Sequence, residues 1–115
     1  VIVMVERESP FGIYVLLHIL CVCPSRVRYY YLGKSIHLVI CNGADMSAQE
    51  LYPVVAKIFD VSQPSIAAGL RLAVEDCVTG GDACFLEDIT GGCFYHSVPT
   101  MDFINLTASY LTRSF

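Results

Sequence analysis

The chain has few charged residues for its size. Of its 115 residues, 16% are charged and 55% are hydrophobic. This composition excludes an intrinsically disordered protein, which needs low hydrophobicity and high charge. It favours a single domain with a substantial core. Because the apolar share is high, we also expect part of the surface to face another domain or a second copy of the chain.

No apolar run is long enough to span a bilayer. The longest, residues 11–22, includes His18 and falls short of the roughly 20 residues that a spanning helix needs. No basic segment precedes it, since Glu6 and Glu8 flank Arg7, so a signal peptide is not indicated. We therefore expect a buried helix there, no membrane contact and a cytoplasmic location. The sequence does not begin with methionine, and we expect it to be an excised piece of a longer protein.

Motifs for metal binding and catalysis are missing. Six cysteines are present, but none forms the Cys-x2–4-Cys pair of a structural zinc site, and we interpret them as buried free thiols. The glycine pairs at 80–81 and 91–92 are typical of turns rather than of phosphate-binding loops. We predict no metal, no cofactor and no enzymatic activity. The remaining possible ligands are His18 with Cys21 and Cys23, and His37 with Cys41.

The sequence does contain a helix-turn-helix pattern at about residues 48–78. Ser47 and Glu50 have the spacing of a capping box, which predicts a helix start. Asp60 falls where the turn is expected, Val61 fills the corner between the helices, and Ser62 can cap the second helix. The second helix of such a unit can lie in a DNA major groove. We predict inward residues on the first helix at Leu51, Val54, Val55 and Ile58, and on the second at Ile66, Leu70, Ala73, Val74 and Cys77.

The other segments also read as helices. We predict an all-α fold of about six helices in one domain, residues 11–115, after a tail at residues 1–10. A glycine follows the second helix at Gly43, as is common after helices, and the last helix offers Phe103, Ile104 and Leu106 for burial. The expected helices are residues 11–21, 25–41, 48–59, 63–78, 82–89 and 99–111.

A specific combination of residues marks the first helix of this unit. Leu51, Tyr52 and Pro53 are followed by Ala56-Lys57 and Phe59, and proline near a helix start is uncommon. Matching segments also occur at residues 17–20, 31–36 and 99–104. Over residues 16–111 the chain resembles the C-terminal effector domain of the stage zero sporulation protein A family of response regulators.

This resemblance implies a cytoplasmic regulator of transcription during sporulation. Such a protein binds double-stranded DNA as a homodimer, contacts RNA polymerase and is controlled in a phosphorelay through an N-terminal receiver domain. The resemblance also implies that Lys57 and Arg71 match basic residues of the family. Two arginines and a glutamate of the family's recognition helix are replaced here by Ser65, Ala68 and Ala67, respectively. Base-specific readout therefore does not carry over.

Local charge predicts weak DNA binding. Residues 45–102 hold nine acidic and two basic residues, a net charge of −7 with histidine neutral, whereas duplex affinity comes largely from Lys and Arg. Gln63 is the only usual base-reading side chain on the outward face, and the helix N-terminus could hold one phosphate. The predicted DNA contacts are Lys57, Ser62, Gln63, Ser65 and Arg71.

Two further surfaces have alternative interpretations. Ala67, Ala68 and Leu72 on the outward face suggest a diverged module for protein contact or self-association, or a plain solvent face. Arg26, Arg28 and Lys34, beside tyrosines 29–31, could bind nucleic acid or an acidic partner. For this second group we favour a solvated helix face with half-buried tyrosines.

Overall fold

The computed structural model describes residues 26–80 and 99–114. These residues form four α-helices and no strand, so the predicted all-α class is confirmed for the described part of the chain. The helices predicted at residues 11–21 and 82–89, and the tail at residues 1–10, lie outside the described residues. The helices are α3 (Val27–Asn42), α4 (Ala48–Phe59), α5 (Gln63–Gly80) and α7 (Thr100–Ser114).

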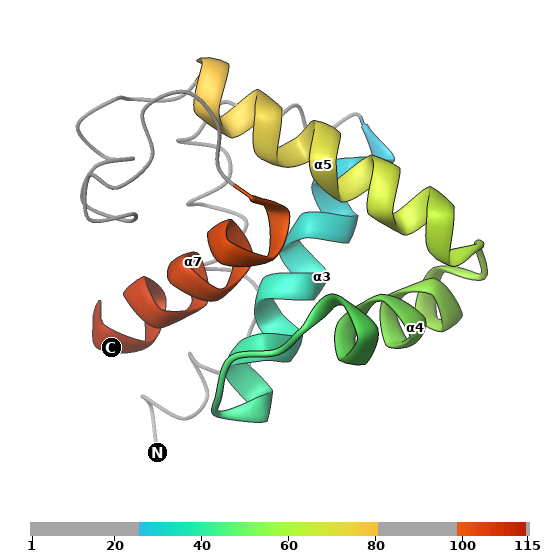
Figure 1. The fold of residues 1–115 in the computed structure, drawn as a ribbon. Helices are drawn as coiled ribbons and strands as arrows, with labels where there is room; N and C mark the ends of the chain where they lie inside the picture. Colours follow the sequence, from blue (N-terminus) through green and yellow to red (C-terminus); the bar gives the residue numbers. More distant parts are fainter. Residues whose placement is uncertain (1–25, 81–98, 115) are drawn as a thin grey trace.

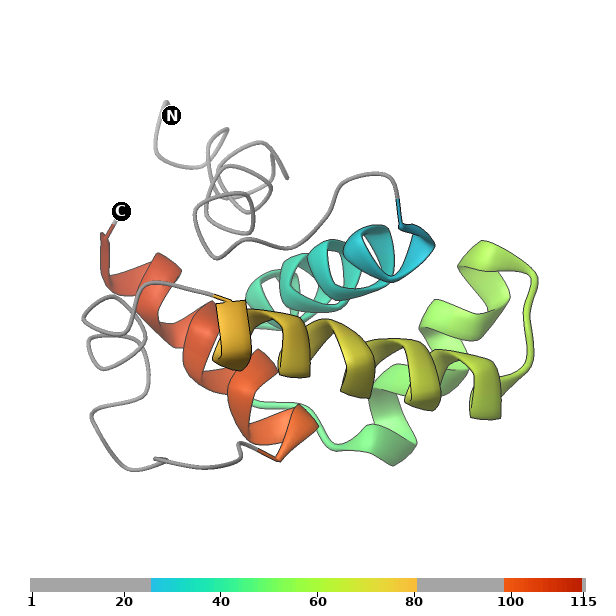
Figure 2. The same cartoon turned by 90° about the horizontal axis from the view of Figure 1, so that it is seen from above.

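Helix α3 contacts all three of the other described helices. In Figure 1, α7 and α4 lie on opposite sides of α3, and α5 runs across the upper part of the picture, above α4. The view from above shows α5 alongside α3, with α4 at the far end from α7 (Figure 2). Within the described ranges, no helix combines the length and the apolarity needed to cross a bilayer.

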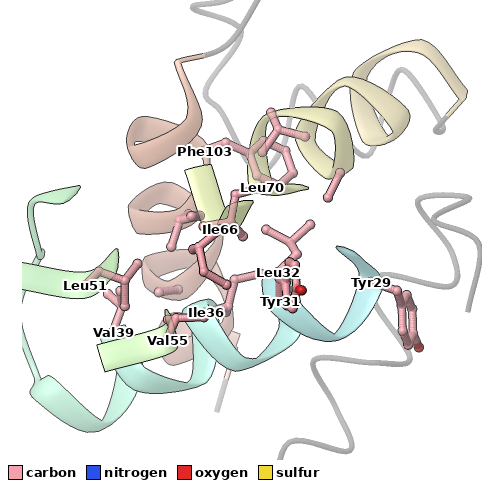
Figure 3. Close-up of a cluster of buried hydrophobic side chains, with 14 of the residues drawn as sticks. Tyr29, Tyr31, Leu32, Ile36, Val39, Leu51, Val55, Ile66, Leu70 and Phe103 are labelled. Carbon is pink, nitrogen blue, oxygen red and sulfur yellow. The ribbon is translucent and has the colours of Figure 1, made fainter. Parts of the chain in front are cut away.

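The core forms where the four helices converge (Figure 3). The predicted inward stripe of α5 is confirmed, because all five of its residues are buried. Phe103 and Ile104 of α7 are also fully buried, as predicted, whereas Leu106 is only half-buried. The largest fully buried side chains are Phe103, Leu32, Ile36, Leu51, Ile66, Leu70, Ile104 and Val55.

For two of the four residues of α4 that were predicted to point inward, the prediction is wrong. Leu51 and Val55 are fully buried, but Val54 is 43% exposed and Ile58 is 48% exposed. The helix lies at an edge of the described fold and packs through one side only, so the other side is left without a neighbouring helix (Figure 1). Because apolar residues occur on both sides of α4, periodicity alone did not identify the buried one.

Helix ends follow the local signals in the sequence. The capping box at α4 is complete: the Ser47 hydroxyl accepts the Glu50 N–H at 3.3 Å, and the Glu50 carboxylate accepts the Ser47 N–H at 3.1 Å. Gly43 ends α3 in the left-handed region at φ 76°, as predicted. A Cβ there would meet nothing within 4 Å, so glycine is needed for the backbone angle rather than for space. Helix α5 continues two residues beyond its predicted end, to Gly80.

Candidate nucleic-acid interface

Helices α4 and α5 are joined by three residues, Asp60, Val61 and Ser62. Asp60 adopts the left-handed region, with φ 55° and ψ 50°, which Asp tolerates better than most non-glycine residues. The Val61 N–H donates to the Ala56 carbonyl at 3.0 Å, and the half-buried Val61 side chain packs against the core. The turn therefore lies where the sequence predicts it, and it fixes the direction in which α5 leaves α4.

Helix α5 begins at an exposed, serine-rich end. The Ser62 hydroxyl accepts the Ser65 N–H at 3.3 Å, which confirms the predicted cap. The two hydroxyl oxygens of these serines also lie 2.8 Å apart. Ser62, Gln63 and Ser65 are all exposed, as a DNA contact requires.

The outer face of α5, defined here as Ala68, Arg71, Leu72 and Glu75, lies opposite its buried stripe. All four residues are exposed, and Leu72 is 39% exposed. Ala67, which the sequence also suggested for a protein contact, is half-buried at the margin of this face. The outer face thus carries one cation, one anion and two apolar residues.

An ion pair joins α5 to α3 beside the outer face of α5. The Asp76 carboxylate accepts a hydrogen bond from Nε of Arg28 on α3 at 2.8 Å. No local pattern in the sequence predicts this pair, because 48 positions separate the two residues. The pairing leaves Glu75 as the acidic residue that shares the outer face with Arg71.

Close packing against α3 sets the position of α5. A Cβ added to Gly69 would lie 2.8 Å from Cδ2 and 3.0 Å from Cε2 of the Tyr31 ring. The same ring meets Phe59 of α4 edge-on, with ring centroids 4.8 Å apart. Tyr31 therefore contacts both helices of the α4–α5 pair. Gly69 was the residue in the sequence that could have indicated this close packing. Glycine inside a helix costs about 1 kcal/mol of stability relative to alanine, so its presence indicates that a side chain would not fit there.

The basic and aromatic group at the start of α3 does not form one continuous surface. Tyr29 and Tyr31 are buried, whereas Tyr30 is 45% exposed, so the prediction of three half-buried tyrosines is wrong. Because successive side chains of an α-helix point in directions about 100° apart, three consecutive tyrosines cannot share one environment. Arg28 pairs with Asp76 and Lys34 is half-buried, so Arg26 is the exposed cation of this group.

The two described cysteines differ in environment. Cys77 is buried and forms no disulfide, as predicted, but Cys41 is exposed, which corrects the prediction for that residue. Its sulfur lies 3.5 Å from Nε2 of His37, one turn earlier on α3. In the described part of the chain, no three His, Cys, Asp or Glu residues are grouped closely enough to hold a metal ion.

Stability should fall at alkaline pH because of two tyrosines, the buried Tyr29 and the half-buried Tyr52. Burial raises the pKa of Tyr52 on α4 above its ordinary value of 10.0, and burial together with the neighbouring Tyr30 raises the pKa of Tyr29. This contribution is complete below pH 10, and it is lost as the pH rises above 10, because the unfolded chain releases the proton first. Urea unfolding of Tyr52→Phe should show a weaker loss of stability across that range than the unchanged protein. Equal losses in the two proteins would contradict the assignment to Tyr52.

Lys57 is exposed on α4, between the exposed residues Val54 and Ile58. All five predicted DNA contacts are therefore accessible: Lys57, Ser62, Gln63, Ser65 and Arg71. Comparisons of this chain with protein-family models, with curated proteins and with solved structures gave no match.

Proposed function

We propose that α4 and α5 form a DNA-binding helix-turn-helix and that the chain is a transcriptional effector domain of the sporulation response-regulator type. This proposal rests on which side of α5 is exposed. Its whole outer face and its capped N-terminus are exposed, while the opposite stripe is buried. A helix held in this way can enter a major groove with its N-terminal residues first. Dimeric binding, contact with RNA polymerase and an attached receiver domain belong to the same proposal.

The proposed contacts are mainly to phosphate. Ser62 and Ser65 lie at the positive end of the α5 dipole, which favours an anion, and Arg71 lies two turns further along the outer face. Gln63, at the exposed start of α5, has a side chain that can form hydrogen bonds with the edge of a base. With so few cations the affinity should be modest and should fall with added salt.

Arg71→Ala should weaken duplex binding several-fold and reduce the slope of log affinity against log salt by about 1, because one phosphate contact is lost. The measurement is fluorescence anisotropy with a labelled duplex, repeated from low to physiological salt. Arg26→Ala is the matched control, since this exposed arginine precedes α3, outside the α4–α5 pair, and its change should leave affinity unchanged. Loss of affinity in the control alone would place the DNA interface near the start of α3. Absence of binding by the folded protein at low salt would overturn the proposal.

Glu75→Gln should have the opposite effect. Glu75 is exposed one turn after Arg71, so its charge repels a phosphate backbone lying along the outer face of α5. Removing that charge should raise duplex affinity by about twofold to fivefold at low salt, with a smaller gain at high salt because exposed charges are screened. The same anisotropy titration measures it. A loss of affinity would show that Glu75 helps to bind DNA and would contradict the proposed orientation.

A second candidate function, protein contact through the outer face of α5, is favoured by one observation. Leu72 is 39% exposed beside the exposed Ala68, so this face has an apolar part that phosphate contacts do not use. Leu72→Asp distinguishes the two candidates. If the face binds DNA, the added acid should weaken duplex binding. If the face binds protein, the change should reduce the self-association that sedimentation measures.

A further inference from the structure

Helix α4 carries a second exposed apolar surface, separate from the outer face of α5. The outer face of α4, defined here as Glu50, Val54, Lys57 and Ile58, consists of exposed residues on the side of the helix turned away from the buried Val55 and Ala56. Val54 is 43% exposed and Ile58 is 48% exposed. Figures 1 and 2 show α4 at one end of the described helices, with no described helix beyond this side.

The four residues form a continuous stripe with an ordered charge pattern. Their spacing of four, seven and eight residues from Glu50 places them on one face of the helix. Glu50 lies at one end, Lys57 lies near the other, and Val54 lies between them. The stripe has no net charge, whereas the chain as a whole has a net charge of −4. The stripe itself therefore adds no net repulsion where two copies meet through it.

From this pattern we infer that the outer face of α4 binds the same face of a second copy of the chain, with the two α4 helices antiparallel. A two-fold axis beside Val54 brings each Glu50 opposite Lys57 of the other copy, so both charge pairs form at once. The exposed side chains of Val54 and Ile58 are then buried between the helices. A parallel arrangement would place like charges opposite each other, so the charge order selects the antiparallel one.

This inference assigns Lys57 to a protein contact instead of the phosphate contact predicted from the sequence. It supplies a surface for the dimeric binding proposed above, but that surface lies on α4 and involves none of the α5 residues proposed to contact DNA. Its test uses the full chain without DNA. The failure of either proposal can therefore be recognised independently of the other.

The first experiment is sedimentation equilibrium of the full chain over a wide concentration range. The unchanged protein should dimerise, and Val54→Asp or Ile58→Asp should raise the dissociation constant at least about tenfold, because each would bury an unpaired carboxylate. Val27→Asp is the matched control, since Val27 is 58% exposed on α3 and its change should leave the dissociation constant unaltered. A protein that is monomeric at every concentration overturns the inference. So does a dimer that survives both α4 changes, which would place the interface elsewhere.

The second experiment tests the charge pairs without disturbing the fold. Glu50→Gln keeps a side chain that can complete the capping box with Ser47, and Lys57 is exposed. Lys57→Glu should raise the dissociation constant about threefold to tenfold by placing two acids together. Glu50→Gln should weaken the dimer of the unchanged chain but strengthen that of Lys57→Glu. An effect of the same sign in both backgrounds overturns the proposed pairing, because a general loss of helix stability would act equally in both.

Discussion

Phe103→Ala is expected to lower the free energy of unfolding by about 3–5 kcal/mol. Phe103 is 0% exposed and is the largest of the fully buried side chains. It belongs to the same cluster as Ile66 and Leu70 of α5, so its ring joins α7 to the helix proposed to bind DNA (Figure 3). Its removal leaves a cavity among residues of several helices, which cannot all move inward together.

Urea unfolding followed by circular dichroism measures this loss. Ser109→Ala is a matched control on the same helix, because Ser109 is exposed and its change should alter stability by no more than about 0.5 kcal/mol. Domains of this size are stable by about 5–15 kcal/mol, so Phe103→Ala should also lower the folded population available for any binding assay. A loss below about 1 kcal/mol would mean that α7 does not pack on α5 as described.

Gly69→Val should destabilise the protein by about 2–3 kcal/mol, although valine normally suits a helix slightly better than glycine. The reason is steric: the added side chain would begin 2.8 Å from a ring carbon of Tyr31. That ring cannot easily swing aside, because Tyr31 is only 6% exposed and Phe59 lies against it. Either the ring or the whole of α5 must shift, and both would disturb the α4–α5 pair.

Ala68→Val is the control for this prediction. Ala68 is the adjacent residue and is exposed, so its change should cost only the difference in helix propensity, about 0.5 kcal/mol. Thermal unfolding of the two variants side by side measures the difference. Equal losses would show that position 69 has room for a side chain and would contradict the close approach of α5 to α3.

Features of the fold that depend on neighbouring residues were predictable from the sequence. The Ser47–Glu50 capping box, the left-handed Gly43 and the turn at Asp60 each depend on a few consecutive residues. The inward stripe of α5 was also predictable, because its apolar residues recur at helical spacing, whereas the opposite face carries Arg71 and Glu75 beside Ala68 and Leu72. These signals locate both helices of the candidate site and the turn between them.

Features that depend on distant parts of the chain were not predictable. The Arg28–Asp76 ion pair joins two helices across 48 positions, and no local pattern marks it. The exposure of Val54 and Ile58 depends on which side of α4 meets the core. Because apolar residues occur on both sides of the helix, the sequence alone does not identify that side. Gly69 gave a signal that something must approach closely, but only the fold identifies Tyr31 as the neighbour.

The most direct test of the central claim is to map amide chemical shifts while a short duplex is added to the isotopically labelled chain at low salt. If the outer surface of α5 binds DNA, the shifts should change along its exposed residues, from Gln63 through Ala68 to Arg71 and Leu72, and should return when salt is raised. Changes confined to the exposed start of α3, around Arg26 and Tyr30, or no changes at all in the folded protein, would contradict the claim.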